Sequence, residues 1–561
     1  MIKKSQKFQW ISGFVAASLL TVVLPSEAKR FIVMVGDKET FEQTHQQVKG
    51  YSNVFLSGVV VRKDGQQSVK PFSKAKVKVE DSLENLSSLV VNVDDDSEGA
   101  LLALKANPAV TIVEEEIFHP LPKPVRGQVF PKAFADVTAA SVLSSATPWG
   151  ILAVKAPQAW RVTQGQGART LILDTGVDKD HPALAANFES GKDFVGDNIS
   201  PYPFFDQLGH GSHVAGTIAG AALPSGFVGV APQSKFLMGR VCAKEGCSSI
   251  AIAQGINWGI AQRVDLISMS LGGPIGTAVE RRAVEAADKA GITVVAASGN
   301  DSSATVSYPA KFPSVIAVGA LDSKMQKASF SQYGPELSIA APGVSVTSSV
   351  PQGTGRDSQV TLSGLGSDRV VASTSFIGSP DLPQGAVGQL VLSGLGKPED
   401  FKTVNVRGKF ALIQRGEIPF TDKVQNAINA GASGVVIYNN QAGLVQGALS
   451  KDGTLLPIPV AMIEQTSGEE VKRALAVGRV VSAKVATVPT DYASMDGTSM
   501  ATPHVAGVVA LMKSANKNLR PSAVKQLIRS TAVPLAPNDQ NQLGAGLIDA
   551  EKAVGAALNA R

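Results

Sequence analysis

Long basic runs and long apolar runs are both missing from the body of this sequence. The net charge is +5 over 561 residues, and Lys and Arg do not cluster beyond the N-terminus, so nucleic-acid binding is not expected. A membrane-spanning helix needs about 20 apolar residues, and no stretch after the N-terminus has that pattern. Hydrophobic residues make up 44% and charged residues 18%, which is typical of a globular chain with several domains.

The N-terminus has the pattern of a secretory signal peptide. Lys3, Lys4 and Lys7 precede a largely apolar run over 10–24, and small residues at 26 and 28 suit a signal peptidase. We expect residues 1–28 to be removed on export to the cell exterior or the periplasm, with an uncleaved anchor as the alternative. No cysteine stands near the cleavage point, so no lipid anchor is expected.

Cysteine is nearly absent, with only Cys242 and Cys247 in the whole chain. In an exported protein we expect so close a pair to close a small loop as a disulfide, and two free thiols are the alternative. Neither cysteine has a histidine or a second cysteine pair nearby, so a metal site is not expected there.

Histidine is also scarce, which shortens the search for a catalytic base. The chain contains His45, His119, His181, His210, His213 and His504. His210 stands in the stretch LGHGSHVAGTIAG, and His213 follows three residues later on the same expected helix. Two histidines at that spacing could share a metal, but no Glu lies between them and their neighbours are small, so we expect no metal.

From residue 146 onward, continuous apolar strands alternate with helical stretches. This alternation predicts an α/β fold with a mostly parallel sheet flanked by helices. The working groups of such sheets lie just beyond the C-terminal ends of the strands. Asp174, the stretch SLGG and Asn300 all stand at such ends.

Two changes of composition divide the chain further. Residues 29–145 combine strand patterns, a helical pattern over 96–108 and a connector without periodicity, which predicts a small α+β unit with a linker. Residues 352–488 contain a β-rich piece followed by a strand–helix–strand pattern, which predicts an inserted α/β unit. The main domain is then expected in two parts, 146–351 and 489–561.

The stretch DGTSMATPHVAG, residues 496–507, combines a tight turn with a helix start near Ser499. The first N–H groups of a helix lack partners and favour negative charge, so Ser499 is well placed to attack a carbonyl. Pro503 is expected within this unpaired first turn, where it costs little. A serine nucleophile needs a base, and the base needs an acceptor such as the strand-end carboxylate of Asp174. Asn300 could donate a side-chain N–H to the oxyanion.

Eight stretches, taken in order, resemble a subtilisin-type serine endopeptidase of the subtilase family. They are ILDTGVDKDHP, GHGSHVAGTIAG, VGVAP, ISMSLGG, VVAASGN, YPAKFPSVIAVGA, AAPGV and DGTSMATPHVAG. The resemblance implies that Asp174 orients the base, His210 is the general base and acid, and Ser499 is the nucleophile, in subtilisin's chain order. It further implies an oxyanion hole made by the Ser499 backbone N–H and Asn300.

The resemblance also covers the specificity pocket and the two flanking units. The implied pocket walls are Ser270, Leu271, Gly272, Gly273, Ala297, Ser298 and Gly299. Residues 29–145 resemble an inhibitory propeptide with a ferredoxin-like α+β fold, removed by self-cleavage. Residues 352–488 resemble a protease-associated (PA) domain that binds substrate or controls access, with a passive spacer as the alternative.

Two departures from the family pattern concern metal binding and the cleft. Positions that often hold a structural calcium carry Ala183 and Leu223, so we expect that site to be lost, while another calcium site stays open. The loop between Cys242 and Cys247 stands where the family builds a cleft edge, and a disulfide would stiffen that edge.

The sequence therefore predicts a secreted, monomeric serine endopeptidase that hydrolyses peptide bonds of proteins through an acyl-enzyme. It is expected to be a self-processing zymogen that needs no cofactor for catalysis. An exopeptidase of the same fold and a catalytically silent binding protein are the alternatives. His213 and His504 are expected to have structural roles.

Overall fold

The computed structural model describes residues 29–36, 58–61, 67–70, 77–93, 101–102, 104–105, 110–121, 147–376, 378–441, 444, 449 and 455–560. The expected signal peptide and nearly all of the connector that holds the expected maturation site lie outside these residues. None of the helices within these ranges combines the length and the apolar character that crossing a bilayer requires.

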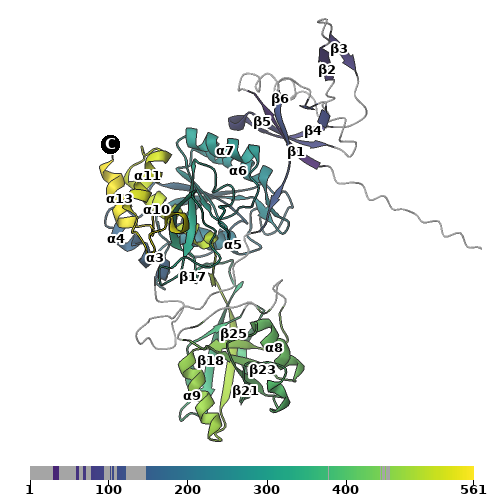
Figure 1. The fold of residues 1–561 in the computed structure, drawn as a ribbon, viewed down its shortest axis with the longest axis vertical. Helices are drawn as coiled ribbons and strands as arrows, with labels where there is room; N and C mark the ends of the chain where they lie inside the picture. Colours follow the sequence, from purple (N-terminus) through teal and green to yellow (C-terminus); the bar gives the residue numbers. More distant parts are fainter. Residues whose placement is uncertain are drawn as a thin grey trace, which may run out of the picture.

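A seven-stranded sheet with parallel strand pairs forms the centre of the main domain (Figure 1). Its strand order is β16-β15-β14-β13-β8-β10-β9. The strands are β8 (Arg169–Asp174), β9 (Phe188–Asp193), β10 (Lys235–Arg240), β13 (Leu266–Met269), β14 (Thr293–Ala297), β15 (Val315–Leu321) and β16 (Leu337–Pro342). Helices cover both faces, so the central strands are buried on both sides and mostly apolar. The expected α/β fold is confirmed.

The helices divide between two hydrophobic cores, one on each face of this sheet. One core includes α5 (His210–Ala219), α10 (Thr498–Ala515), α11 (Pro521–Thr531) and α13 (Ala550–Asn559), and the other includes α6 (Ser249–Gln262) and α7 (Ala278–Lys289). Shorter helices are α3 (Trp149–Ala153), α4 (Ala156–Ala159) and α12 (Gln540–Leu543). Helix α7 begins at a capping box in which Thr277 and Glu280 bond each other's backbone N–H.

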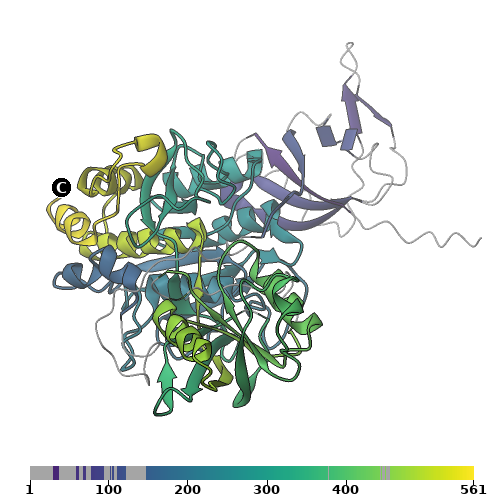
Figure 2. The same ribbon diagram turned by 60° about the horizontal axis from the view of Figure 1, so that its bottom comes forward.

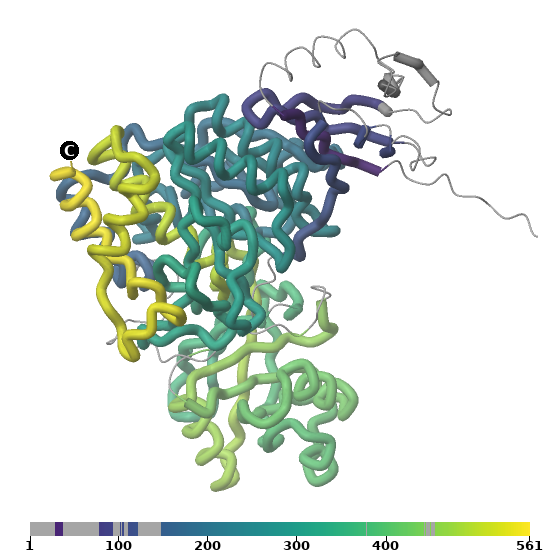
Figure 3. Tube along the Cα trace, turned by 45° about the horizontal axis from the view of Figure 1, so that its top comes forward, coloured from purple at the N-terminus to yellow at the C-terminus, as the bar shows by residue number. Residues whose placement is uncertain are grey.

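The leading unit has a four-stranded antiparallel sheet with the order β4-β5-β1-β6. Its strands are β1 (Lys29–Val35), β4 (Val77–Leu83), β5 (Ser88–Val93) and β6 (Val110–Glu115), and a separate hairpin joins β2 (Gly58–Val61) to β3 (Gln67–Lys70). Ile32, Met34 and Leu86 join the same core as α6 and α7, and Figure 3 shows the purple tube against these helices. The ferredoxin-like description stays a prediction, because the stretch expected to be helical is described only in part.

The inserted unit has an eight-stranded sheet with the order β19-β18-β25-β21-β22-β23-β24-β20. Its elements are β18 (Gly355–Ser363), β19 (Arg369–Val371), β20 (Ser373–Ser375), β21 (Leu382–Leu392), β22 (Phe410–Gln414), α8 (Phe420–Asn429), β23 (Gly434–Tyr438), β24 (Val460–Ile463), α9 (Gln465–Ala476) and β25 (Ser482–Thr490). The strand–helix–strand pattern expected from the sequence is β22–α8–β23.

The insert enters and leaves through paired strands. β18 pairs with β25, and β17 (Val346–Ser349) pairs with β26 (Tyr492–Met495) just before it. Two hydrophobic clusters of the insert's own residues form its core. Figures 1 and 2 show the insert in green, and in Figure 1 it lies at the opposite end of the molecule from the leading unit. The exact domain boundaries stay predictions.

Candidate active site

A buried carboxylate and a buried imidazole meet where β8 ends and α5 begins. The His210 Nδ1–H donates to Asp174 Oδ1 over 2.7 Å, and the Thr175 backbone N–H donates to the same oxygen over 2.8 Å. Asp174 is fully buried and His210 is 5% exposed. This bond fixes the ring and its tautomer. His210 Nε2 has no hydrogen-bond partner among the described residues.

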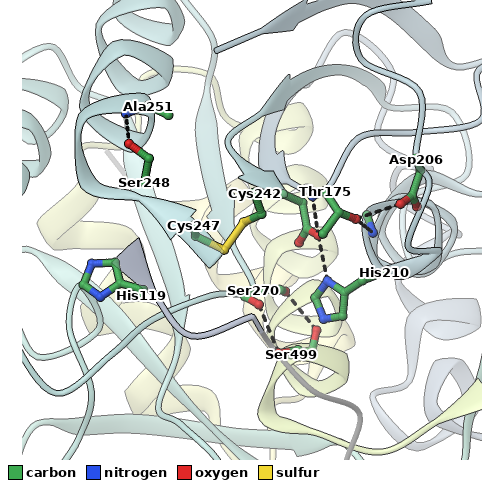
Figure 4. Close-up of a disulfide and its surroundings, with 12 residues drawn as sticks. His119, Thr175, Asp206, His210, Cys242, Cys247, Ser248, Ala251, Ser270 and Ser499 are labelled. Carbon is green, nitrogen blue, oxygen red and sulfur yellow. Dashed lines mark hydrogen bonds and ion pairs between the residues drawn. A yellow bond between two sulfur atoms is a disulfide. The ribbon is translucent and has the colours of Figure 1, made fainter. Parts of the chain in front are cut away.

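A second buried carboxylate, Asp206, holds the beginning of α5 in place. It accepts hydrogen bonds from Thr175 Oγ1 over 2.8 Å and from the backbone N–H groups of Leu208, Gly209 and Ser212 at 2.7–3.1 Å. Figure 4 shows Thr175 between Asp206 and His210. Sequence reasoning missed Asp206, although an Asp shortly before a helix start is a capping signal.

The two carboxylates set the basicity of His210. Burial by itself lowers the pKa of this imidazole, while the charge of Asp174, its hydrogen bond and the charge of Asp206 raise it. The net effect is a His210 pKa above its ordinary value of 6.5. His210 is therefore a stronger base than a free histidine.

Ser499, near the start of α10, bonds its hydroxyl to the main chain of Ser270 and not to this base. Its Oγ–H donates to the Ser270 backbone carbonyl over 3.0 Å (Figure 4). The structure therefore brings Ser499 to Ser270 and does not form the expected bond from Ser499 to His210. A rotation of the Ser499 side chain would free the hydroxyl, and catalytic hydrogen bonds often tighten only when substrate is bound.

The expected place of Pro503 in the first turn is wrong. Helix α10 begins at Thr498, so Pro503 is its sixth residue and stands in the second turn. Proline has no N–H to bond the Ser499 carbonyl four residues earlier. The Ser270 hydroxyl donates to that carbonyl over 2.8 Å instead. Ser270 thus bonds both the side chain and the backbone of Ser499.

Asn300, three residues after β14, has its amide held in one orientation. Its Oδ1 accepts hydrogen bonds from the Thr498 backbone N–H and from Thr498 Oγ1, each over 2.9 Å. The Nδ2 donor is left to face Gly497, where an added Cβ would lie 3.5 Å from it. A donor next to the first residues of α10 has the position that an oxyanion donor needs.

The two segments expected to line the specificity pocket are joined by residues 307–308. Gly273 exchanges two backbone hydrogen bonds of 2.9 Å with Tyr308, and Ser307 N–H donates to the Ser298 carbonyl over 2.9 Å. Gly299 has φ +110°, and a side chain there would collide with Gln332, so only glycine fits. The structure thus brings 270–273 and 297–299 together beside Ser499.

The expected disulfide between Cys242 and Cys247 is confirmed, with an S–S distance of 2.05 Å. It joins β11 (Cys242–Ala243) to β12 (Gly246–Ser248), and β12 pairs with β7 (Phe118–His119) from the leading unit. His119 and His210 lie on opposite sides of this hairpin in Figure 4. Sequence reasoning gave no role to His119.

The remaining buried histidines near the site bond the main chain. His213 Nε2–H donates to the Val346 carbonyl over 2.9 Å, and His504 Nδ1–H donates to the Met500 carbonyl over 2.9 Å. Burial lowers the pKa of His213 to about 3 and that of His504 to about 4, so both rings are neutral near pH 7. Within the described part of the chain, no group of three His, Cys, Asp or Glu side chains could hold a metal ion.

Comparison with known proteins finds two matching families and many relatives. The Subtilase family matches residues 165–368 and 474–547, and the PA domain family matches residues 386–471. Subtilisin J from Geobacillus stearothermophilus is 33% identical over 356 residues, which are 62% of this chain and 82% of the relative. Subtilisin from Bacillus pumilus is 42% identical over 217 residues, which are 38% of this chain and 78% of the relative.

Among solved structures, similarity extends to the psychrophilic subtilisin-like protease Apa1 from the Antarctic psychrotroph Pseudoalteromonas sp. AS-11. The TM-score is 0.57 at 29% sequence identity. The alignment covers 74% of this chain and 100% of that chain.

Proposed function

Because the chain belongs to the subtilase family and is a serine endopeptidase, we propose that Asp174, His210 and Ser499 form its catalytic triad. The observation that carries this proposal is the 2.7 Å bond between buried His210 and Asp174. His210 Nε2 has no hydrogen-bond partner within the described part of the chain, and α5, which begins with His210, packs against α10, which carries Ser499.

The reaction starts when the Ser499 hydroxyl turns from the Ser270 carbonyl toward His210. His210 Nε2 takes the proton while Ser499 Oγ attacks the carbonyl carbon of the substrate, and Asp174 stabilises the imidazolium. The Ser499 N–H and Asn300 Nδ2 bind the resulting oxyanion. His210 then gives its proton to the leaving amine, and water hydrolyses the acyl-enzyme by the same steps. This chemistry uses no cofactor, and the usual first calcium position of the family is proposed to be lost.

The leading unit is proposed to be an inhibitory propeptide of a zymogen. Its Glu114 carboxylate accepts hydrogen bonds of 3.0 and 3.1 Å from the first N–H groups of α7, at Ala278 and Val279. Arg282 on the same helix donates to the Val35 carbonyl over 3.1 Å. The segment that follows adds β7 as a strand on the disulfide hairpin. A strand in this place occupies the edge along which a substrate would bind.

Export and substrate range complete the proposal. The pattern over residues 1–28 and the disulfide support secretion, because disulfides persist in oxidising compartments. The substrates are proteins and peptides, and the insert is proposed to bind them or to control their access. The enzyme is proposed to act as a monomer.

Labelling with a serine-directed fluorophosphonate tests the nucleophile. We expect the mature protein to be labelled at Ser499, and we expect the purified Ser499→Ala precursor to stay uncut because maturation uses the same site. Ser530→Ala, which removes an exposed hydroxyl on α11, is the matched control and should mature normally. Label on another residue, or processing of the purified Ser499→Ala protein, would refute the proposal. Release of only terminal di- or tripeptides from a long denatured substrate would favour an exopeptidase.

A further inference from the structure

Glu280 is a fully buried carboxylate in the first turn of α7. Its Oε2 accepts hydrogen bonds from the Thr277 backbone N–H over 3.1 Å and from Thr277 Oγ1 over 2.8 Å. Its Oε1 is 2.6 Å from His119 Nε2. One oxygen is therefore held by the helix to which Glu280 belongs, and the other faces the segment that follows the leading unit.

His119 lies between the disulfide hairpin and one of the segments expected to line the pocket. Its backbone pairs with Cys247, and its side chain is 2% exposed. A Cβ added to Gly273 would lie 2.5 Å from His119 Nδ1, so the glycine leaves room for the ring. Cys247, Gly273 and Glu280 thus surround one imidazole-sized site.

This site lies on the path of a bound substrate. Ser270 contacts Ser499, and Gly273, three residues further along the same segment, contacts His119. Two extended chains that lie side by side both advance about 3.3 Å per residue, so one substrate residue lies beside each of residues 270–273. The substrate residue whose carbonyl reacts lies beside Ser270, and the residue three positions earlier lies beside Gly273, with its side chain at Glu280. Counted from the cleaved bond, this is the fourth residue before it.

Departure of the propeptide changes the hydrogen bonding of Glu280. When His119 leaves, water reaches Oε1 in its place. A substrate side chain that covers the site again without donating a hydrogen bond leaves a buried acceptor without a partner, which is unfavourable. A substrate side chain with an N–H group restores the bond. Leucine cannot donate a hydrogen bond, and a glutamate would bring a second negative charge against the first.

We propose that Glu280 makes this enzyme select substrates with an N–H donor side chain, histidine above all, at the fourth residue before the cleaved bond. The inference rests on the proposed function, because the site is part of the same substrate-binding edge. In the precursor, the segment that contains His119 binds as a substrate would, and His119 fills the site beside Glu280.

The test uses the mature enzyme and peptides that differ only at that fourth residue, which is histidine, leucine or glutamate. We expect kcat/KM to be at least about tenfold higher for histidine than for leucine, and lowest for glutamate, since a site built to hydrogen-bond rejects an analogue that cannot. Mass spectrometry locates the cleaved bond in each peptide. Equal rates, or a preference for leucine, would overturn the proposal. If no peptide is cleaved, the proposed function fails instead.

Two variants on α7 assign the preference to one residue. Glu280→Leu should reverse the order of the histidine and leucine peptides. Glu285→Leu removes an exposed carboxylate from the same helix and should keep the preference for histidine. A Glu280→Leu enzyme that still prefers histidine would contradict the role of Glu280. If that variant does not fold, the peptide series on the unmodified enzyme still decides the proposal.

Discussion

Asn300 shows how a single side chain is prepared for catalysis before substrate arrives. Thr498 bonds its Oδ1 through a backbone N–H and a hydroxyl, which leaves Nδ2 as the free end of the amide. Because the orientation is set in advance, the donor needs no reorganisation when an oxyanion forms.

Replacing Asn300 by leucine should therefore slow the chemical step and leave substrate binding nearly intact. We expect kcat to fall about 10²–10³-fold with KM within about threefold; the rate figure is the one known for the equivalent donor in subtilisin, a relative of this protein. Steady-state kinetics on a chromogenic peptide measure both constants. Asn518→Leu, at an exposed asparagine, is the control, and a KM that rises while kcat stays constant would contradict the role.

The pH dependence of activity follows from the raised pKa of His210. The base must be neutral to accept a proton, so kcat/KM is full above the His210 pKa and falls as pH drops through it. Because that pKa lies above 6.5, the acid limb of the kcat/KM profile should have its midpoint above pH 6.5. Asp206→Asn removes one of the charges that raise the pKa, so its acid limb should move to lower pH.

The profiles of the two enzymes are measured on the same peptide between pH 5 and about 9, a range that spans the ordinary pKa of histidine. A midpoint below 6.5 in the unmodified enzyme would contradict the electrostatic argument. Thermal unfolding of Asp206→Asn checks that α5 keeps its place, since Asp206 also bonds the backbone there.

At the scale of elements, the β11–β12 hairpin is a short structure that must keep its shape to pair with another strand. The disulfide closes a loop with a sequence separation of 5, which corresponds to about 2 kcal/mol of chain entropy in the unfolded state. The hairpin offers its edge to β7 in the precursor and, in our proposal, to substrate in the mature enzyme.

Changing both Cys242 and Cys247 to serine should loosen this edge. We expect KM to rise several-fold for peptides with four or more residues before the cleaved bond, with kcat nearly unchanged. Peptides with only two residues before the cleaved bond do not reach the site that His119 fills in the precursor. Their KM should stay unchanged, so they serve as the control. A rise in KM that is the same for long and short peptides would show that the hairpin edge is not the cause.

At the scale of the whole molecule, the insert is attached by two strands that pair with each other. Gly355 lies opposite Thr490, so the chain leaves and re-enters the catalytic domain at neighbouring points. The insert also has its own cores, separate from those around the seven-stranded sheet. Both facts indicate that it can be removed without opening the catalytic domain.

Joining Gly355 to Thr490 through a two-residue turn should give a folded enzyme, because paired antiparallel strands accept such turns. We expect kcat/KM for a short peptide to stay within about twofold, while kcat/KM for a folded protein substrate falls several-fold as an accessory binding surface is lost. A shuffled linker of the same length in the same place is the control. Unchanged activity on both substrates would identify the insert as a passive spacer.

The sequence by itself determined the parallel α/β architecture, the PA insert and the disulfide pair. These features depend on local information. Apolar strands that end at Asp174 or near Asn300 are visible in short windows, and two cysteines five positions apart are already neighbours. Short motifs also carried the family resemblance, which placed Asp174, His210 and Ser499 in order along the chain.

Only the tertiary structure decided which distant groups meet. Asp206 stands near His210 because it caps α5, and Ser270 bonds the Ser499 carbonyl that Pro503 leaves without a helical partner. His119 and Glu280 are 161 residues apart and come from different units of the fold. No local pattern encodes such a pair, because its distance depends on how one domain packs against another.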